Sequence, residues 1–485
     1  MKLSEIYWGD DSAEKDLYLF EYFVTSDAFK RLRKKTKGIV VGRKGSGKSA
    51  LRKKLEQEFS VDENTYVIDI TPKYNSIRSI LNDKTIMNSF GQEIFFQYTW
   101  LRHILLDSLC GIGDDIKGQY AKDSVEFARK IALKLNRTSK DFVENITDVL
   151  SRLKVKAGSL GELGIQLEKE LRNVAEVDAL EYNLVQIAES GAKFVILIDD
   201  LDLGWDNSLP SNNLLLGLLS ATSYLSSKSH NIYTCVFLRE DVYSILLSLT
   251  QHSDKYRNVE RIRWEKNDLI NILNLRIAYN RKNKGLPPID NPFLAVFPET
   301  LGTSNTDNWL IERTLARPRE LIQLARYYTE SVDGEEPDVD ALKNSEADYS
   351  SWKLDDLCSE YSNQYPDLIS VFAYWKTTFF RHKYHLPHKE IEDMLFKIAL
   401  EVKIDQPWFN KIRNEANTDY FLKILYDIGF IGDFVLGGEG GSKTFYSYNE
   451  RHEPHFDEVQ IHPCFRRAVN SVERIRTKKN ESTEI

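Results

Sequence analysis

The stretch from Gly42 to Ser49, GRKGSGKS, restricts the fold of this chain more than any other feature of its sequence. It matches G-x-x-x-x-G-K-[S/T], the pattern of a phosphate-binding loop, which forms between a buried strand and the start of a helix. Within residues 37–41 just before it, the last three are the β-branched Ile39, Val40 and Val41. They lie between Gly38 and Gly42, as in a short strand. After it, Leu51, Leu55 and Phe59 recur at helical spacing. The sequence therefore predicts a P-loop NTPase core, an α/β fold with a parallel sheet.

The residue types of this loop suit a nucleotide triphosphate. Its glycines let the backbone turn its N–H groups toward phosphate oxygens, and the following helix adds its positive end. Lys48 can bridge the β- and γ-phosphates, and the Ser49 hydroxyl can coordinate Mg²⁺. We therefore predict ATP or ADP and Mg²⁺ as cofactors, the alternative being a chance glycine turn. The predicted nucleotide-binding residues are Gly42, Arg43, Lys44, Gly45, Ser46, Gly47, Lys48, Ser49 and Ala50.

A second run supplies the acidic partner that such a loop needs on a neighbouring strand. Residues 194–198 are consecutively apolar, as in a buried parallel strand, and Asp199 and Asp200 follow them. Function gathers at the carboxyl ends of such strands. We predict that Asp199 serves Mg²⁺ together with Ser49, and that Asp200 orients or deprotonates the attacking water. Asp202 is a weaker candidate, and a solvated acidic turn is the alternative for the whole run.

Two further strands are expected around this pair. A strand is expected at residues 231–238, and Arg239 follows it. Arg239 could sense the γ-phosphate or stabilise charge in the transition state. A surface salt bridge from Arg239 to Glu240 or Asp241 is equally open at this point. The strand expected at Thr65–Ile70 is predicted to lie beside the strand that precedes the glycine loop. The predicted catalytic residues are Lys48, Asp200 and Arg239.

The order of motifs resembles the STAND branch of the AAA-like P-loop ATPases, nearest to the bacterial KAP-like and related "GRKGSGKSA" ATPases. The resemblance rests on GRKGSGKSA at 42–50, IDDLD at 198–202, FLRED at 237–241 and LARPRELI at 315–322. It covers about residues 15–75 and 190–330. It implies that the acidic pair serves Mg²⁺ and water and that the arginine after the next strand is a sensor.

The resemblance also implies roles outside the core. Arg317 and Arg319 would report the nucleotide state from a helical lid, and Tyr22 and Phe23 lie where related ATPases seat the adenine base. For these two aromatic residues, packing in the core is an equally open interpretation. Asp200 stands where most AAA+ ATPases have Glu, so we expect slow hydrolysis. KAP proteins often carry membrane helices, whereas this sequence has no apolar run of the ~18 residues that a membrane helix needs.

The spacing of motifs predicts a core split by an insertion, because about 150 residues separate the glycine loop from the acidic strand. Residues 155–165 within that insertion read as a hairpin or loop, and helices followed by a glycine-tipped hairpin near the C-terminus suggest a winged-helix-like module. The predicted parts are a core at 1–75 and 190–255, a mainly helical insertion at 76–189, a helical lid at 256–330, an acidic linker or helix at 331–364 and a winged-helix-like domain at 365–485.

Composition limits the partners that we expect. The chain has 65 basic and 73 acidic residues among 485, a net charge of −8, which argues against a protein that coats polyanions. Its four cysteines are widely spaced, as in a cytoplasmic protein without disulfides. Between Lys30 and Lys54 there are twelve basic residues and no acidic one. This run could be a solvated surface, a contact for nucleic acid or a contact for an acidic protein.

The function predicted from these features is an ATP-dependent switch in the cytoplasm that turns ATP and water slowly into ADP and phosphate. It would control its own assembly into a homo-oligomer or the action of a protein effector, with no membrane partner. The family context suggests bacterial antiviral defence. Two alternatives are a nucleic-acid-dependent ATPase that places the winged-helix module on DNA, and a non-catalytic adaptor that uses nucleotide only to stabilise its fold.

Overall fold

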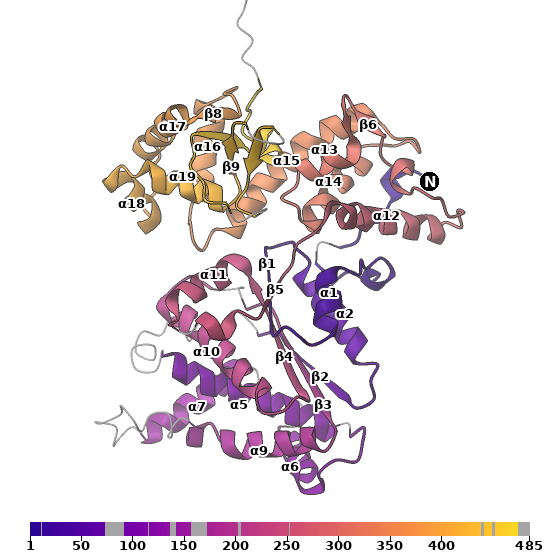
Figure 1. Cartoon of the computed structure of the whole chain (residues 1–485), viewed down its shortest axis with the longest axis vertical. Coiled ribbons are helices and arrows are strands. Elements are labelled where there is room, and N and C mark those ends of the chain that lie inside the picture. The colour runs from indigo at the N-terminus through magenta and orange to yellow at the C-terminus, as the bar shows by residue number, and fades with distance from the viewer. Residues whose placement is uncertain are drawn as a thin grey trace, which may run out of the picture. The chain divides into compact units, whose positions relative to one another are not determined.

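A computed structural model describes residues 1–10, 12–72, 92–114, 116–135, 142–156, 172–201, 205–251, 253–437, 441–448 and 452–473. The chain divides into two compact units, which are drawn in Figure 1. We call Asp11–Phe20 together with Thr25–Arg263 the sheet unit. We call Met1–Asp10, Glu21–Val24 and Trp264–Ile485 the helical unit. Each unit has its own hydrophobic core.

The sheet unit is built on a five-stranded parallel sheet in the order β2-β3-β4-β1-β5. Its central strands are apolar runs that are buried over almost their whole length, as expected of strands covered on both faces. The strands are β1 (Ile39–Gly42), β2 (Thr65–Ile70), β3 (Lys193–Ile198), β4 (Ile232–Arg239) and β5 (Val259–Arg261).

Helices cover both faces of this sheet. Helix α2 (Lys48–Phe59) packs on β1, β2 and β3 and contacts α1 (Asp27–Arg33). On the other side, α10 (Leu209–Ser226) packs on β4 and against α5 (Glu93–Asp114), as Figure 1 shows. The remaining helices of the unit are α6 (Lys122–Lys134), α7 (Phe142–Lys156), α9 (Val177–Glu189), α11 (Glu240–Leu249) and the short η4 (Ser253–Tyr256).

The predicted α/β architecture with a parallel sheet is confirmed, but one strand was misplaced. β2 pairs only with β3 at the sheet edge, and the neighbours of β1 are β4 and β5. The burial pattern of β2 explains the error, since Val67 and Ile68 are half-buried and Asp69 is exposed, as is usual at an edge. The described part of 76–189 is helical, whereas most of the expected hairpin at 155–165 lies outside the described residues.

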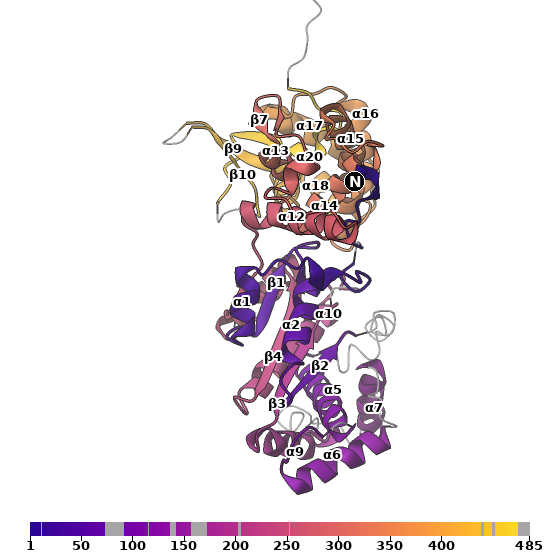
Figure 2. The same ribbon diagram turned by 90° about the vertical axis from the view of Figure 1, so that its right-hand side faces the viewer.

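The helical unit contains most of the remaining elements. A four-stranded antiparallel sheet has the order β10-β9-β11-β8, and Figure 2 shows β9 and β10 side by side. Its strands are β8 (His385–Pro387), β9 (Ile431–Val435), β10 (Lys443–Phe445) and β11 (Glu458–Ile461), and a small pair is formed by β6 (Thr300–Leu301) and β7 (Ser304–Asn305).

Amphipathic helices enclose the core of this unit. The predicted acidic linker contains a long one, α15. The helices are α12 (Lys266–Asn283), α13 (Thr306–Glu312), α14 (Pro318–Glu330), α15 (Val339–Glu360), α16 (Leu368–Thr378), α17 (His388–Glu401), α18 (Pro407–Glu415), α19 (Thr418–Asp427) and α20 (Pro463–Arg466), with short turns η1 (Leu3–Glu5), η2 (Leu19–Glu21, which begins in the sheet unit) and η5 (Phe293–Ala295).

Two expectations about the chain as a whole can be compared with the structure. Among the helices in the described ranges, none is both long and apolar enough to cross a bilayer. The four cysteines, Cys110, Cys235, Cys358 and Cys464, are buried and form no disulfide. Burial raises the pKa of the Cys235 and Cys358 thiols to about 12, so these side chains stay protonated near neutral pH.

Candidate nucleotide-binding site

The glycine loop joins β1 to α2 in the way that its sequence predicts. Gly45 and Gly47 have φ angles of 77° and 94°, left-handed values that favour glycine, and Gly47 caps α2. The Ser46 N–H donates to the Arg43 carbonyl at 3.1 Å, which closes the turn. The Lys48 ammonium donates to the Gly42 carbonyl at 3.0 Å and therefore lies over the loop from which it projects.

Gly42 shows how closely the loop folds on itself. A Cβ atom at this position would lie 2.4 Å from the Ser46 Oγ and 3.3 Å from the Cδ1 of Ile262 on the segment after β5. Contacts under 3.0 Å do not occur for real Cβ atoms, so any side chain here would displace Ser46. Two left-handed glycines between a strand end and a helix start turn backbone N–H groups toward one point, and such a loop fits a phosphate group.

The carboxyl edge of the sheet brings several predicted residues into one unit. Gly42 pairs in register with Arg239 at the end of β4, and β3, which ends just before Asp199, lies beyond β4. The sequence had suggested that the acidic strand, β3, is the direct neighbour of β1. In the structure β4 lies between them. Asp199, Asp200, Arg239 and the glycine loop nevertheless all follow the same ends of parallel strands, where ligands of open α/β sheets bind.

Asp199 is buried and held by an arginine that sequence reasoning missed. Its carboxylate is 2% exposed and lies 3.3 Å from the Nε of Arg52, on the first turns of α2. Arg52 also forms ion pairs with Asp69 of β2 and, at 3.7 Å, with Glu14. Burial lowers the pKa of Arg52, but the carboxylates of Asp69, Asp199 and Glu14 outweigh it and raise the pKa. A cation at Asp199 would share this carboxylate with Arg52.

Asp200 adopts an uncommon backbone conformation. Its φ angle is 59°, in the left-handed region, which aspartate adopts more readily than most non-glycine residues. Asp200 is half-buried and comes directly after the buried Asp199. This position suits a carboxylate that must lie in the site and also contact a water molecule. Asp202 lies outside the described residues.

Arg239 has a partner in the structure, as one of the two interpretations of its sequence predicts. Its guanidinium donates to both carboxylate oxygens of Asp241, at 3.1 and 2.7 Å, and the residue is 8% exposed. Glu240 instead binds Arg261 at 2.8 Å and Arg263 at 2.5 Å. Burial raises the pKa of Glu240, but Arg263 and Arg261 outweigh it, so the net pKa lies below the usual value. A sensing role for Arg239 would require it to leave or share Asp241.

The other predicted nucleotide contacts, Tyr22, Phe23, Arg317 and Arg319, belong to the helical unit. Arg317 is 2% exposed and pairs with Glu360 at 2.8 Å and with Glu320 at 3.5 Å, while Arg319 lies 3.6 Å from Asp356.

Tyr22 is 1% exposed, and its ring lies 5.4 Å from that of Tyr279 and 4.3 Å from the guanidinium of Arg276. The structure thus shows Tyr22 packed among residues of its own unit. It brings together only the glycine loop, Asp199, Asp200 and Arg239 within one unit.

The predicted metal site would depend on the nucleotide. Among the described residues, no group of three or more His, Cys, Asp or Glu side chains is arranged to hold a metal ion. Mg²⁺ in nucleotide sites is usually held by one or two protein oxygens plus substrate phosphates and water. Ser49 and Asp199 could supply such oxygens, with the phosphates and water completing the coordination.

Comparison with known proteins places a family match on the helical unit. Residues 267–358, which span α12 to most of α15, match a family described as the FunZ-associated C-terminal helical domain. The chain is also 25% identical over 503 residues to the "Putative transposon gamma-delta 80.3 kDa protein" of Escherichia coli (strain K12). That similarity covers 96% of this chain and 67% of the E. coli protein.

Proposed function

We propose that this protein is a P-loop NTPase that binds ATP with Mg²⁺, hydrolyses it slowly and acts as a nucleotide-dependent switch. One observation carries the proposal. A loop in which a Cβ atom at position 42 would meet the Ser46 Oγ, and in which Gly45 and Gly47 are left-handed, joins a buried strand to a helix at the same sheet edge as two aspartates and an arginine. ATP would supply the phosphoanhydride bond that water cleaves to ADP and phosphate, and Mg²⁺ would neutralise phosphate charge.

Each residue of this edge has a defined task in the proposal. Lys48 would exchange its carbonyl partners, Gly42 and Arg43, for phosphate oxygens. Ser49 and Asp199 would hold the metal, while Asp200 would orient the attacking water. Two ion pairs explain why turnover would be slow, because Arg239 is held by Asp241 and Asp199 is held by Arg52. Arg239 must leave or share Asp241, and Asp199 must be shared between Arg52 and the metal, before the site can act on a triphosphate.

Calorimetric titration with ATP and Mg²⁺ tests the binding step. Lys48→Ala should abolish binding, because it removes the ammonium that lies over the loop at the Gly42 carbonyl. Lys30→Ala is the matched control, since this lysine of the same basic run is exposed and pairs only locally with Asp27. Wild-type binding that persists in the Lys48 variant, or no binding by the wild type, would refute the proposal.

The switch itself predicts a change of assembly or shape. Sedimentation velocity of the wild type should differ between the nucleotide-free protein and the protein with ATP and Mg²⁺, and Lys48→Ala should remove the difference. The partner would be a second copy of the chain or a protein effector, and the proposed setting is bacterial antiviral defence in the cytoplasm. Bound stoichiometric ADP with no phosphate release under any condition would instead favour an adaptor that uses nucleotide for stability.

A nucleic-acid-dependent ATPase is the second candidate. It is favoured by helices α18 and α19, which are joined only by Ala416 and Asn417, as in a helix-turn-helix, and by the name of the transposon-associated relative. The exposed face of α19 weighs against it, because Asp419 and Asp427 outnumber Lys423 there. Phosphates would be repelled from such a face. ATP hydrolysis that rises with duplex DNA and falls steeply with salt would support this candidate.

A further inference from the structure

Residues 12–20, which we call the linking segment, lead from the sheet unit into the helical unit. They belong to the sheet unit, and Glu21–Val24, which follow them directly, belong to the helical unit. Of residues 12–20, only Asp16 and Leu19 are buried, and three large apolar side chains are exposed: Leu17, Tyr18 and Phe20. Burial of its own side chains therefore contributes little to the position of this segment, which depends on contacts with its neighbours.

Helix α2, which begins at the glycine loop, holds the linking segment with three consecutive side chains. The guanidinium of Arg52 lies 3.7 Å from the carboxylate of Glu14. The ammonium of Lys53 donates to the Glu14 carbonyl at 3.1 Å, and that of Lys54 lies 5.4 Å from the centre of the Phe20 ring. Positive groups thus attach the linking segment to the helix that would bind the phosphates.

Arg52 also reaches the candidate site from the same helix. Its side chain is 3% exposed, and its Nε lies 3.3 Å from the buried carboxylate of Asp199, while its terminal nitrogens pair with Asp69 and Glu14. Glu56, one turn further along α2, interacts electrostatically with Arg52 and Asp69, and burial, followed by the charge of Asp69, raises its pKa. One buried guanidinium therefore connects the proposed ligand of Mg²⁺ to the linking segment.

A metal ion at Asp199 would change how this guanidinium is shared. The ion neutralises the Asp199 carboxylate and repels the guanidinium, because like charges a few ångströms apart interact strongly inside a protein. The carboxylates of Asp69 and Glu14 keep their attraction for Arg52. Arg52 should therefore turn away from Asp199 and pair more strongly with Glu14 of the linking segment.

We propose that Arg52 couples the metal at Asp199 to the linking segment, so that binding of ATP with Mg²⁺ draws this segment more tightly onto α2. The inference rests on the proposed function, because the metal arrives with the nucleotide. Magnesium acts here by preferring the state in which Arg52 has released Asp199. Since residues 21–24 follow directly in the chain, this step carries the nucleotide state to the start of the helical unit.

Hydrogen exchange of the full chain, read by mass spectrometry in peptides from residues 12–20, tests the proposal. The protein is compared without nucleotide, with a non-hydrolysable ATP analogue and Mg²⁺, and with the analogue and EDTA. Exchange of the linking segment should be about two- to fivefold slower with the analogue and Mg²⁺, as expected of one strengthened surface ion pair. With EDTA it should stay at the nucleotide-free rate. Equal slowing with and without Mg²⁺ would overturn the proposal.

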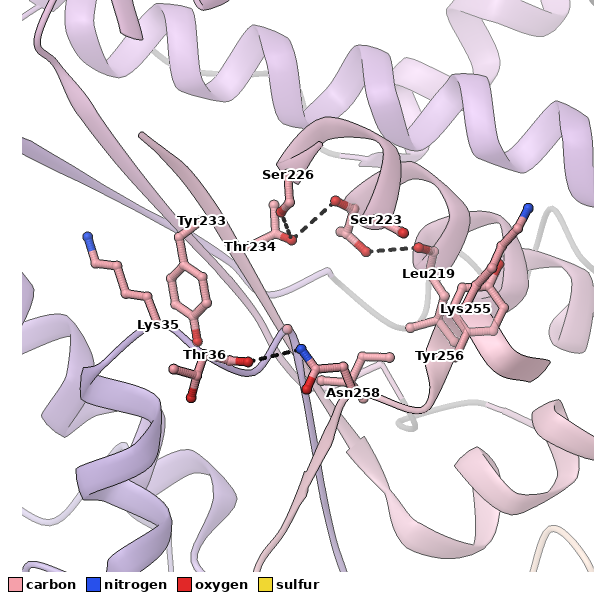
Figure 3. Close-up of a pocket in the computed structure, with 13 residues that line it drawn as sticks. Lys35, Thr36, Leu219, Ser223, Ser226, Tyr233, Thr234, Lys255, Tyr256 and Asn258 are labelled. Atoms are coloured by element: carbon pink, nitrogen blue, oxygen red, sulfur yellow. Dashed lines mark hydrogen bonds between the residues drawn. The ribbon is translucent and has the colours of Figure 1, made fainter. Parts of the chain in front are cut away.

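The opposite ends of the strands supply an internal reference for this experiment. A pocket lies there beside the starts of β1 and β4, whereas the glycine loop and Arg239 follow the other ends of these strands (Figure 3). At its rim the Asn258 side chain donates to the Thr36 carbonyl at 2.9 Å and accepts from the Lys37 ammonium at 3.0 Å. Peptides from residues 253–258 should exchange at one rate in all samples. Equal slowing there and in the linking segment would indicate general stabilisation and overturn the coupling.

Glu14→Gln separates the coupling from nucleotide binding. Its side chain is 41% exposed, so the substitution should leave the fold and the calorimetric affinity for ATP with Mg²⁺ unchanged, while the Mg²⁺-dependent slowing of the linking segment disappears. Glu63→Gln is the matched control, because this exposed acidic residue lies in the loop after α2, and it should keep the slowing.

The two proposals fail in different ways in these experiments. Wild-type slowing that persists in Glu14→Gln would overturn the coupling and leave ATP binding intact. Absence of ATP binding by the wild type in calorimetry would overturn the proposed function and this inference together.

Discussion

Two clusters of charged side chains, one in each unit, differ in their balance. In the helical unit, Arg317, Lys353 and Arg319 face Glu320, Glu360 and Asp356, three bases against three acids. In the sheet unit, Arg52 forms ion pairs with three acids, Glu14, Asp69 and Asp199. Each base of the first cluster is matched by an acid, whereas the single guanidinium of Arg52 is shared among three carboxylates, one of which is the proposed ligand of Mg²⁺.

Because of this difference we expect different roles for Arg317 and Arg52, which the sequence alone does not distinguish. Lys353 is 0% exposed and Arg317 is 2% exposed, and Glu320 and Glu360 are buried with them. We therefore expect the cluster around Arg317 to stabilise the fold. The cluster around Arg52 contains Asp199, the proposed ligand of Mg²⁺, and we expect it to respond to metal. Three substitutions test these expectations.

The largest effect is expected at Arg317. Arg317→Met leaves Glu360 and Glu320 buried with one positive partner fewer, which should reduce the free energy of unfolding by about 3–5 kcal/mol. Chemical denaturation measures this loss. Arg319→Ala is the control, because its side chain is 30% exposed and its 3.6 Å pair should contribute less than about 1 kcal/mol. Equal losses for the two variants would contradict the structural role of Arg317.

A smaller effect with a different signature is expected at Arg52. Arg52→Met should lower the free energy of unfolding by about 2–3 kcal/mol, because the buried Asp199 carboxylate loses its ion pair with Arg52. Excess MgCl₂ should restore more stability to this variant than to the wild type, since Glu14, Asp69 and Asp199 then lose the ion pairs that they share with Arg52. Thermal melts with and without MgCl₂ measure this, with Arg317→Met as the metal-insensitive comparison. If Mg²⁺ acts equally on both variants, the distinction between the clusters fails.

The extent to which the sequence predicts this site depends on whether each signal is local. β3 and β4 were predicted correctly because each is a continuous apolar run with a clear carboxyl end. The place of β2 was wrong, and Arg52 was missed, because strand order and the meeting of Glu14, Asp69 and Asp199 arise only when distant segments pack. A lone arginine inside a basic run gives no local sign of three acidic partners.

The smallest effect is expected at Glu240, whose pKa is lowered from an ordinary value of 4.5. A lowered pKa means that the ionised group stabilises the fold above that value and that this stabilisation is lost as the pH falls below it. At neutral pH, Glu240→Gln should therefore be less stable than the wild type by about 1–2 kcal/mol. The difference should shrink on acidification below about 4.5. Denaturation at several pH values would show a constant difference if this account is wrong.

The decisive measurement is an experimental structure of the protein with a non-hydrolysable ATP analogue and Mg²⁺. The account predicts the triphosphate against the backbone of 42–49, with Lys48 on its phosphates and a metal ion served by Ser49 and Asp199. A nucleotide bound elsewhere, or a metal that leaves Asp199 solely with Arg52, would contradict it.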